Sequence, residues 1–231
     1  MPERGKVTRA ALRTPRAAAV AGIAFSLILG VALVLVRLAV PADPNDAGAW
    51  IEDGWRNTAV TVALYCVPIA GLAFLWFIGV VRDRIGSAED RLFATVFFGT
   101  GVLFVAMLFI SAAAGGALLE VSHSQGSAVS DDVWSFGRHS IYLVLVVYGM
   151  RMAGAFTIVT TAIATRLRMF PRWLVIVGWF SAAVLLLAVE SFPWGVLLFP
   201  LWVLMLSIYF LTHTPAVAPD PVSASPAGDG T

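Results

Sequence analysis

The chain has 231 residues, of which 59% are hydrophobic and 13% charged, and its formal net charge is +1. Soluble domains carry about 25% charged residues, so this composition excludes an ordinary soluble domain and indicates a membrane protein. The single cysteine, Cys66, excludes an intramolecular disulfide, and three histidines are too few for a histidine-rich metal site.

The chain begins with a polar, basic segment. Residues 1–16 contain five Lys or Arg residues and are predicted to form a basic cytoplasmic tail. The apolar run at 17–40 could be a signal peptide, but its apolar part is longer than the ~7–15 residues typical of a signal. Pro41 also disrupts the small-x-small pattern that a cleavage site needs. We therefore expect a retained transmembrane helix.

Further apolar runs follow the first at regular intervals. Each is long enough to cross the hydrocarbon core at ~1.5 Å per residue, and none alternates as the strand of a membrane barrel would. The predicted fold is therefore an all-α polytopic membrane protein whose transmembrane domain, 17–213, contains six helices. The predicted spans are 17–40, 58–81, 92–119, 141–165, 173–191 and 194–212. Residues 214–231, rich in Pro, Ala, Ser and Gly, are predicted to be a disordered cytoplasmic tail.

The distribution of basic residues predicts the orientation of these spans. Eleven of the fifteen Lys and Arg residues fall on the same side as the N-terminus when the spans alternate in direction. Basic residues accumulate in cytoplasmic loops of multi-pass proteins, so both termini are predicted to be cytoplasmic. This rule accounts for the basic residues of the loops, so they do not indicate nucleic-acid binding, and no nucleic-acid partner is expected.

The fourth predicted span carries Arg151 near its middle. A charge there costs roughly 3 kcal/mol, so Arg151 is expected to face protein or water and to have a partner. Helix rise places Arg151 ~22 Å above Arg166, and Glu190 ~27 Å above Arg172 on the next span. Glu190 is therefore the predicted partner, with Tyr148 and nearby threonine hydroxyls as neutral helpers.

Several roles remain open for this candidate intramembrane polar site of Arg151, Glu190 and Tyr148. The ion pair could lock two helices together, or Arg151 could extend towards the outer membrane interface. Alternatively, Arg151 could bind an anionic solute or head group, or share a proton pathway with Glu190. Reversing both charges would separate a structural role from a functional one.

Small residues recur at every fourth position of the same span. Such a stripe lets another helix approach closely. Arg151 lies about 160° around the helix from the stripe, so the fourth span is expected to have protein on two sides and to be central. The predicted helix-packing stripe is Gly149, Ala153, Thr157, Thr161 and Thr165.

Other segments offer weaker candidates. The interval 120–139 contains histidines and carboxylates, which are metal-ligand types, but it is rich in serine and glycine and is expected to be a solvated loop. The glycine-rich segment 111–119 is expected to allow close helix packing. No metalloprotease, serine-hydrolase or P-loop motif occurs in the sequence. We predict no catalytic residue, no cofactor and no metal.

One segment resembles a known pattern. Arg151-Met152-Ala153-Gly154-Ala155-Phe156, followed by Thr165-Arg166-Leu167-Arg168-Met169-Phe170-Pro171-Arg172-Trp173-Leu174, is similar to a pattern in uncharacterised bacterial multi-pass inner-membrane proteins. In these proteins an intramembrane R-x-A-x-x-F precedes a short R-x-x-x-x-P-R-W-L segment. The resemblance covers about a quarter of the chain. It implies a bacterial inner-membrane location and supplies no catalytic residue.

The favoured function is non-enzymatic. We expect an accessory or interaction protein of the bacterial inner membrane that contacts the lipid bilayer and associates with a second copy or another membrane protein. The alternative is a small-solute or ion transporter in which Arg151 contacts an anion, and an enzyme acting on lipid is a third possibility. A polar cavity reaching Arg151 would favour transport, whereas a fully packed pair would favour the structural role.

Overall fold

The computed structural model describes residues 15–40, 53–85, 91–125, 130–192 and 194–213, and these residues are helical with no strand among them. The predicted tails at 1–16 and 214–231 lie outside the described residues except at Pro15 and Arg16, where α2 begins. The longer helices are α2 (Pro15–Ala39), α3 (Gly54–Ile85), α4 (Arg91–Gln125), α5 (Asp131–Tyr142), α6 (Met150–Arg166), α7 (Arg172–Leu187) and α8 (Leu198–Thr212). The short ones are the π-helix η4 (Leu143–Gly149) and the 3₁₀ turns η5 (Val189–Ser191) and η6 (Gly195–Leu197).

Five of the helical segments are long and apolar enough to cross a membrane. They are Ala17–Ala39, Gly54–Arg82, Phe93–Ser124, Asp131–Arg166 and Gly195–Thr212. The apolar helix α7 has 16 residues and is shorter than this group. In hydrocarbon the backbone must satisfy its own hydrogen bonds, which is why long apolar runs fold as uninterrupted helices.

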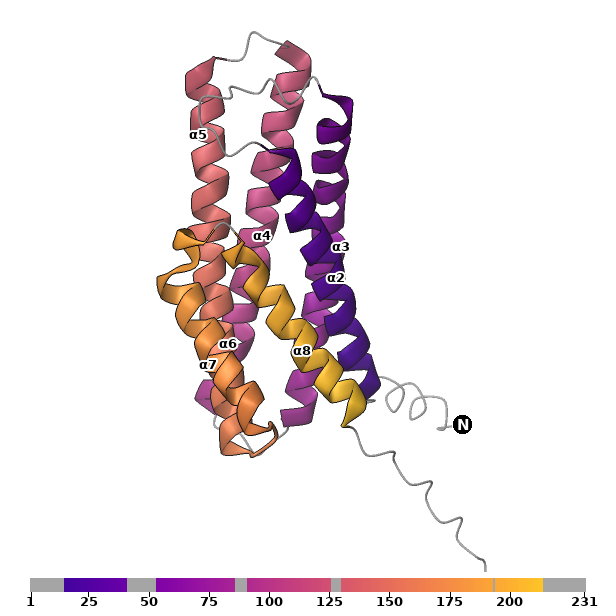
Figure 1. Ribbon diagram of the computed structural model, residues 1–231, viewed down its shortest axis with the longest axis vertical. Helices are drawn as coiled ribbons and strands as arrows, with labels where there is room; N and C mark the ends of the chain where they lie inside the picture. Colours follow the sequence, from indigo (N-terminus) through magenta and orange to yellow (C-terminus); the bar gives the residue numbers. More distant parts are fainter. Residues whose placement is uncertain (1–14, 41–52, 86–90, 126–129, 193, 214–231) are drawn as a thin grey trace, which may run out of the picture.

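The helices differ greatly in length, and this difference divides the bundle into two levels (Figure 1). At ~1.5 Å per residue, α3, α4 and the continuous rod from α5 to α6 are ~48 to ~54 Å long, whereas α7 and α8 are each less than ~25 Å. Arg82, Arg91, Arg166 and Arg172 lie at one end of the bundle, called here the arginine end. The α7–α8 hairpin covers the bundle from that end to about mid-height (Figure 1).

The expectation of a solvated loop at 120–139 is wrong for most of that interval. Helix α4 continues to Gln125, and α5 begins at Asp131 and runs without a break into the fourth predicted span. Ser130 caps α5 by accepting a hydrogen bond from the Val133 backbone N–H, and acidic residues occupy the first turn. Both features stabilise a helix N-terminus, so a polar composition did not prevent a helix from forming.

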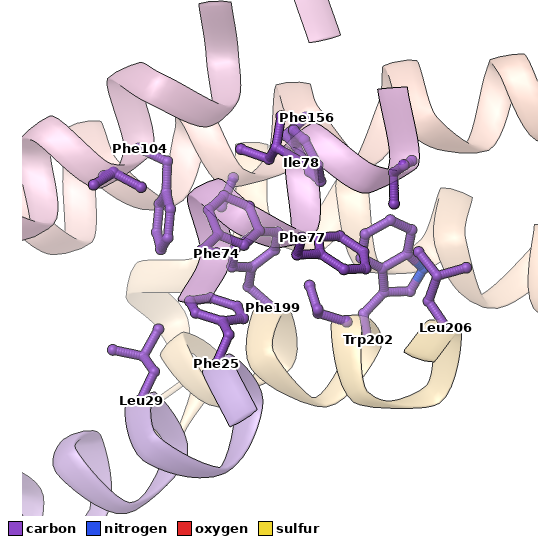
Figure 2. Close-up of a cluster of buried hydrophobic side chains, with 14 of the residues drawn as sticks. Phe25, Leu29, Phe74, Phe77, Ile78, Phe104, Phe156, Phe199, Trp202 and Leu206 are labelled. Carbon is purple, nitrogen blue, oxygen red and sulfur yellow. The ribbon is translucent and has the colours of Figure 1, made fainter. Parts of the chain in front are cut away.

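In the part of the bundle that the α7–α8 hairpin covers, the core is a cluster of phenylalanine side chains (Figure 2). Phe74 of α3 lies at its centre, with ring centroids 4.5 to 6.0 Å from those of five other phenylalanines. Those rings belong to α2, α3, α4, α6 and α8, and they are Phe25, Phe77, Phe104, Phe156 and Phe199. Aromatic packing therefore joins five helices at one point.

Helix α6 packs against α4 and α7. A Cβ added to Gly101 of α4 would lie 3.3 Å from the Phe156 ring, so α4 packs closely on α6 at this glycine. On the other side, a Cβ added to Gly154 would lie 2.9 Å from the Leu186 side chain of α7. Ten residues of α6 are buried by these contacts. This packing fixes the direction in which Arg151 leaves the helix.

Candidate functional site

Arg151 is the second residue after the π-helix η4. The Met150 backbone N–H donates to the Leu145 carbonyl five residues earlier, which is the hydrogen-bond spacing of a π-helix. Arg151 Nη1 donates to the Val147 carbonyl oxygen at 2.6 Å. The wider π turn thus supplies one of the acceptors of the guanidinium, and π segments occur frequently at functional sites.

The second acceptor is Glu190, the residue that helix rise predicts. Arg151 Nη2 donates to Glu190 Oε1 at 3.0 Å, which joins the long α5–α6 rod to the tip of the α7–α8 hairpin. The two side chains are 37% and 44% exposed. The ion pair is therefore half-exposed, neither sealed in the core nor free in solvent.

A tight turn holds Glu190 in place. Helix α7 ends at Leu187, and Glu190 sits in the 3₁₀ turn η5 beside Val189, whose side chain is buried. A Cβ added to Gly195 would lie 2.8 Å from the Val189 carbonyl oxygen, so only glycine permits this close return of the chain. The carboxylate is thus presented by a 3₁₀ turn next to the buried Val189.

Helix rise gives the height of the pair along the bundle. Counted from the arginine end, Arg151 is ~22 Å and Glu190 ~27 Å along their helices. A hydrocarbon core of ~30 Å that begins at the arginine end would include both residues. A half-exposed ion pair within that layer is energetically costly if lipid tails cover it.

The predicted neutral helpers do not contact the pair. Tyr148 is exposed and, among the described residues, makes no hydrogen bond to Arg151 or Glu190. The hydroxyls of Thr157 and Thr165 bond back to their own helix, to the Ala153 carbonyl at 2.8 Å and to the Thr161 carbonyl, whereas the buried Thr161 hydroxyl has no hydrogen-bond partner among the described residues. That expectation was wrong because a helical threonine finds an acceptor four residues back more readily than one across the bundle.

The small-residue stripe is buried along most of its length. Gly149, Ala153, Thr157 and Thr161 are buried, whereas Thr165 is exposed at the end of the helix. A Cβ added to Gly149 would lie 3.4 Å from Met107 Cβ of α4. At the other end of the stripe, Gly178 of α7 packs directly against the Thr161 side chain. Helices α4 and α7 therefore both pack against the stripe.

Replacing Gly178 with valine is expected to destabilise the protein by about 2 kcal/mol, because the new side chain would overlap Thr161 and push α7 away from α6. Thermal unfolding in detergent micelles measures the loss. Gly79→Val is the matched control, since an added Cβ at Gly79 has nothing within 4 Å and the change in helix propensity is the same. Equal losses in the two variants would contradict the close contact.

The described residues contain no group of three or more His, Cys, Asp or Glu side chains that could hold a metal ion. The two histidines of the interval 120–139 have other contacts. Asn57 Nδ2 lies 2.6 Å from His123 Nε2, and His139 Nδ1 lies 2.8 Å from the Ser135 carbonyl oxygen. These contacts join and cap helix ends beyond the hairpin.

The structure also contains an apolar cavity that the sequence reasoning missed. It has a volume of about 180 Å³ and lies between α2, α3, α4 and α5, above the phenylalanine cluster. The glycine-rich segment 111–119 borders it, so the expectation of close helix packing there was wrong. A Cβ added to Gly115 would make only ordinary contact, 3.4 Å from the Leu64 side chain. The small residues of this segment therefore leave space.

Comparisons of the chain with known protein families, with curated proteins and with solved structures found no match.

Proposed function

We propose that the chain is a non-enzymatic accessory or interaction protein of the bacterial inner membrane, with six spans and both termini in the cytoplasm. Five helices long enough to cross a membrane support this count, and α7 with its η5 turn would supply the sixth crossing. The four arginines at one end of the bundle support the orientation, since basic residues accumulate on the cytoplasmic side. The bacterial location rests on the resemblance of the Arg151–Leu174 segment.

The half-exposed ion pair is the observation that carries the proposed interaction. Each of the two charges leaves more than a third of its side chain outside the protein at membrane depth. Lipid tails would cover these atoms at an energetic cost, whereas a polar group on another transmembrane helix would stabilise them. The partner is therefore a membrane helix, from a second copy or another protein, that covers the Arg151–Glu190 pair.

The side chains around the pair suit such a contact. Tyr148 lies one turn before Arg151, and Phe192 and Trp194 follow Glu190 in the hairpin tip. All three are exposed, and tyrosine and tryptophan are enriched at the energetic centres of protein interfaces. We call the surface of Tyr148, Arg151, Glu190, Phe192 and Trp194 the hairpin-tip surface.

No specific observation favours the transporter alternative. The guanidinium of Arg151 already binds the Glu190 carboxylate and the Val147 carbonyl, so an anionic solute would first have to displace Glu190. The large apolar cavity is lined by other residues and does not include the pair.

A photoreactive amino acid at position 148 is expected to cross-link the chain to a protein partner in native membranes, because Tyr148 borders the hairpin-tip surface. Position 65 is the matched control: Tyr65 is 75% exposed and Tyr148 58%, and both lie about 26 Å from the arginine end. Electrophoresis of the cross-linked membranes, followed by mass spectrometry of the adduct, reports the partner. Adducts to lipid alone at position 148 would overturn the proposed function.

A further inference from the structure

The Arg151–Glu190 pair is neutral as a whole and keeps unused hydrogen-bonding groups. A guanidinium carries five N–H groups, and among the described residues Arg151 donates from Nη1 to the Val147 carbonyl and from Nη2 to Glu190 Oε1. Within the same part of the chain, Glu190 Oε2 accepts no hydrogen bond. Because the two charges cancel, the pair does not attract a simple ion. It offers further donors and an acceptor side by side.

An ion pair is a dipole, and a second dipole that points the opposite way is complementary to it. A two-fold dimer supplies this arrangement, because its interface brings residue i of one copy against residue j of the other, and j against i. Copies of one membrane protein share an orientation, so the two-fold axis runs along the membrane normal. Rotation about this axis reverses the in-plane direction of the dipole and keeps every residue at its own height.

Self-pairing about such an axis requires opposite charges at similar heights. Arg151 is ~22 Å and Glu190 ~27 Å from the arginine end, so their heights differ by ~5 Å. The Arg151 side chain already spans this offset within one chain, where Nη2 lies 3.0 Å from Oε1. The same reach joins Arg151 of one copy to Glu190 of another. The pair is therefore complementary to itself, which an arginine or a glutamate alone would not be.

Exposed apolar side chains accompany the pair at an edge of the bundle, where the tip of the α7–α8 hairpin lies (Figure 1). Tyr148, Phe192 and Trp194 are exposed. Leu187 of α7 is 86% exposed, more than any other large hydrophobic side chain among the described residues. It lies ~22 Å from the arginine end, at the height of Arg151. Such neighbours suit an interface, because they exclude water from the polar contact at its centre.

We propose that the partner of the hairpin-tip surface is a second copy of this chain, in a two-fold dimer whose axis runs along the membrane normal beside the Arg151–Glu190 pair. Each Arg151 keeps its bond to its own Glu190 and donates a further N–H to Glu190 Oε2 of the other copy. The two pairs thereby form a closed ring of alternating charges. This inference rests on the proposed function and names the partner that the function requires.

Cysteine cross-linking in native membranes tests the dimer without altering the ion pair. Cys66→Ala removes the native cysteine, and Tyr148→Cys places a thiol one turn from Arg151. With a bismaleimide, copies carrying two different tags are expected to give at least five-fold more covalent dimer than the control Tyr65→Cys, whose thiol lies at the same height on α3. A smaller difference, or no dimer at position 148, overturns the proposal.

Two opposite charge variants test the proposed ring. Arg151→Glu gives a chain with two acidic groups at this surface, and Glu190→Arg gives a chain with two basic groups. In the cross-linking background, each variant alone is expected to form at least five-fold less dimer, and coexpression is expected to restore a mixed dimer. The charges within each variant are alike, so recovery arises only between chains. Absence of the mixed dimer from folded chains overturns the proposal, and if either variant does not fold, the Tyr148→Cys result decides.

Photochemical cross-linking at position 148 separates this inference from the proposed function. An adduct to a different protein, with no covalent dimer from Tyr148→Cys, overturns the second copy and leaves the interaction role standing. Adducts to lipid alone overturn both.

Discussion

Reversing the charge of Arg151 is expected to be one of the two most damaging single changes in this protein. In Arg151→Glu, a second carboxylate would face Glu190 where a 3.0 Å ion pair now stands, and the Val147 carbonyl would lose its donor. Removing one partner of a buried pair costs about 3–5 kcal/mol, and partial exposure lowers this value. We expect a loss of about 2–3 kcal/mol, measured by thermal or SDS-induced unfolding in bicelles.

The double exchange distinguishes the ion pair from the individual side chains. Arg151→Glu combined with Glu190→Arg is expected to recover most of the lost stability, because opposite charges again face each other across the hairpin tip. Arg56→Glu is the control: Arg56 pairs with Asp53 at 3.5 Å with similar exposure, but near the far end of α3. There the loss is expected to be about 0.5 kcal/mol. If Arg56→Glu and Arg151→Glu lost equal amounts of stability, the Arg151–Glu190 pair would be solvated by water like the Arg56–Asp53 pair.

The contact between Arg151 and Glu190 was predictable because geometry alone determines it. Two consecutive antiparallel helices begin at the same arginine end, and a fixed rise per residue brings positions ~22 and ~27 Å along them to similar heights. The exposure of the pair was not predictable. It depends on the hairpin tip ending at mid-height, which follows from a 3₁₀ turn and the close approach of Gly195 to Val189.

Helix α5 shows where composition misleads. Its serines, aspartates and glycine suggest a solvated loop, yet Trp134, Arg138 and Ile141 recur at helical spacing and line one cavity. That periodicity was present in the sequence and was outweighed by polarity. The result matters for the packing, because these three residues line the cavity only if residues 131–142 are helical.

Small residues were ambiguous for a physical reason. Gly154 and Gly178 allow α6 and α7 to approach closely, whereas Gly115 faces a cavity. A glycine in an apolar helix indicates only that no side chain fills its place. Whether a neighbouring helix or a void occupies that space depends on residues distant in the sequence, so the two cases cannot be separated without the packing.

Removing the ring of Phe74 is expected to have an effect comparable to charge reversal, for a different reason. In lipid, transferring a side chain from the core to the surface costs little, so helix association depends on close packing. Phe74→Ala would leave a cavity among five rings that belong to five helices. At about 24 cal/mol per Å³ of unfilled cavity, the expected loss is about 2 kcal/mol.

The comparison with Phe180→Ala decides whether packing holds this bundle together. Phe180 of α7 is 65% exposed, so its truncation removes the same atoms from a surface that lipid covers again without a void. The expected loss there is about 0.5 kcal/mol or less. If the two variants unfold at the same SDS concentration, the phenylalanine cluster does not join the hairpin to the long helices. The close packing of α7 on α6 at Gly154 and Gly178, together with the Arg151–Glu190 pair, would then connect the hairpin to the α5–α6 rod.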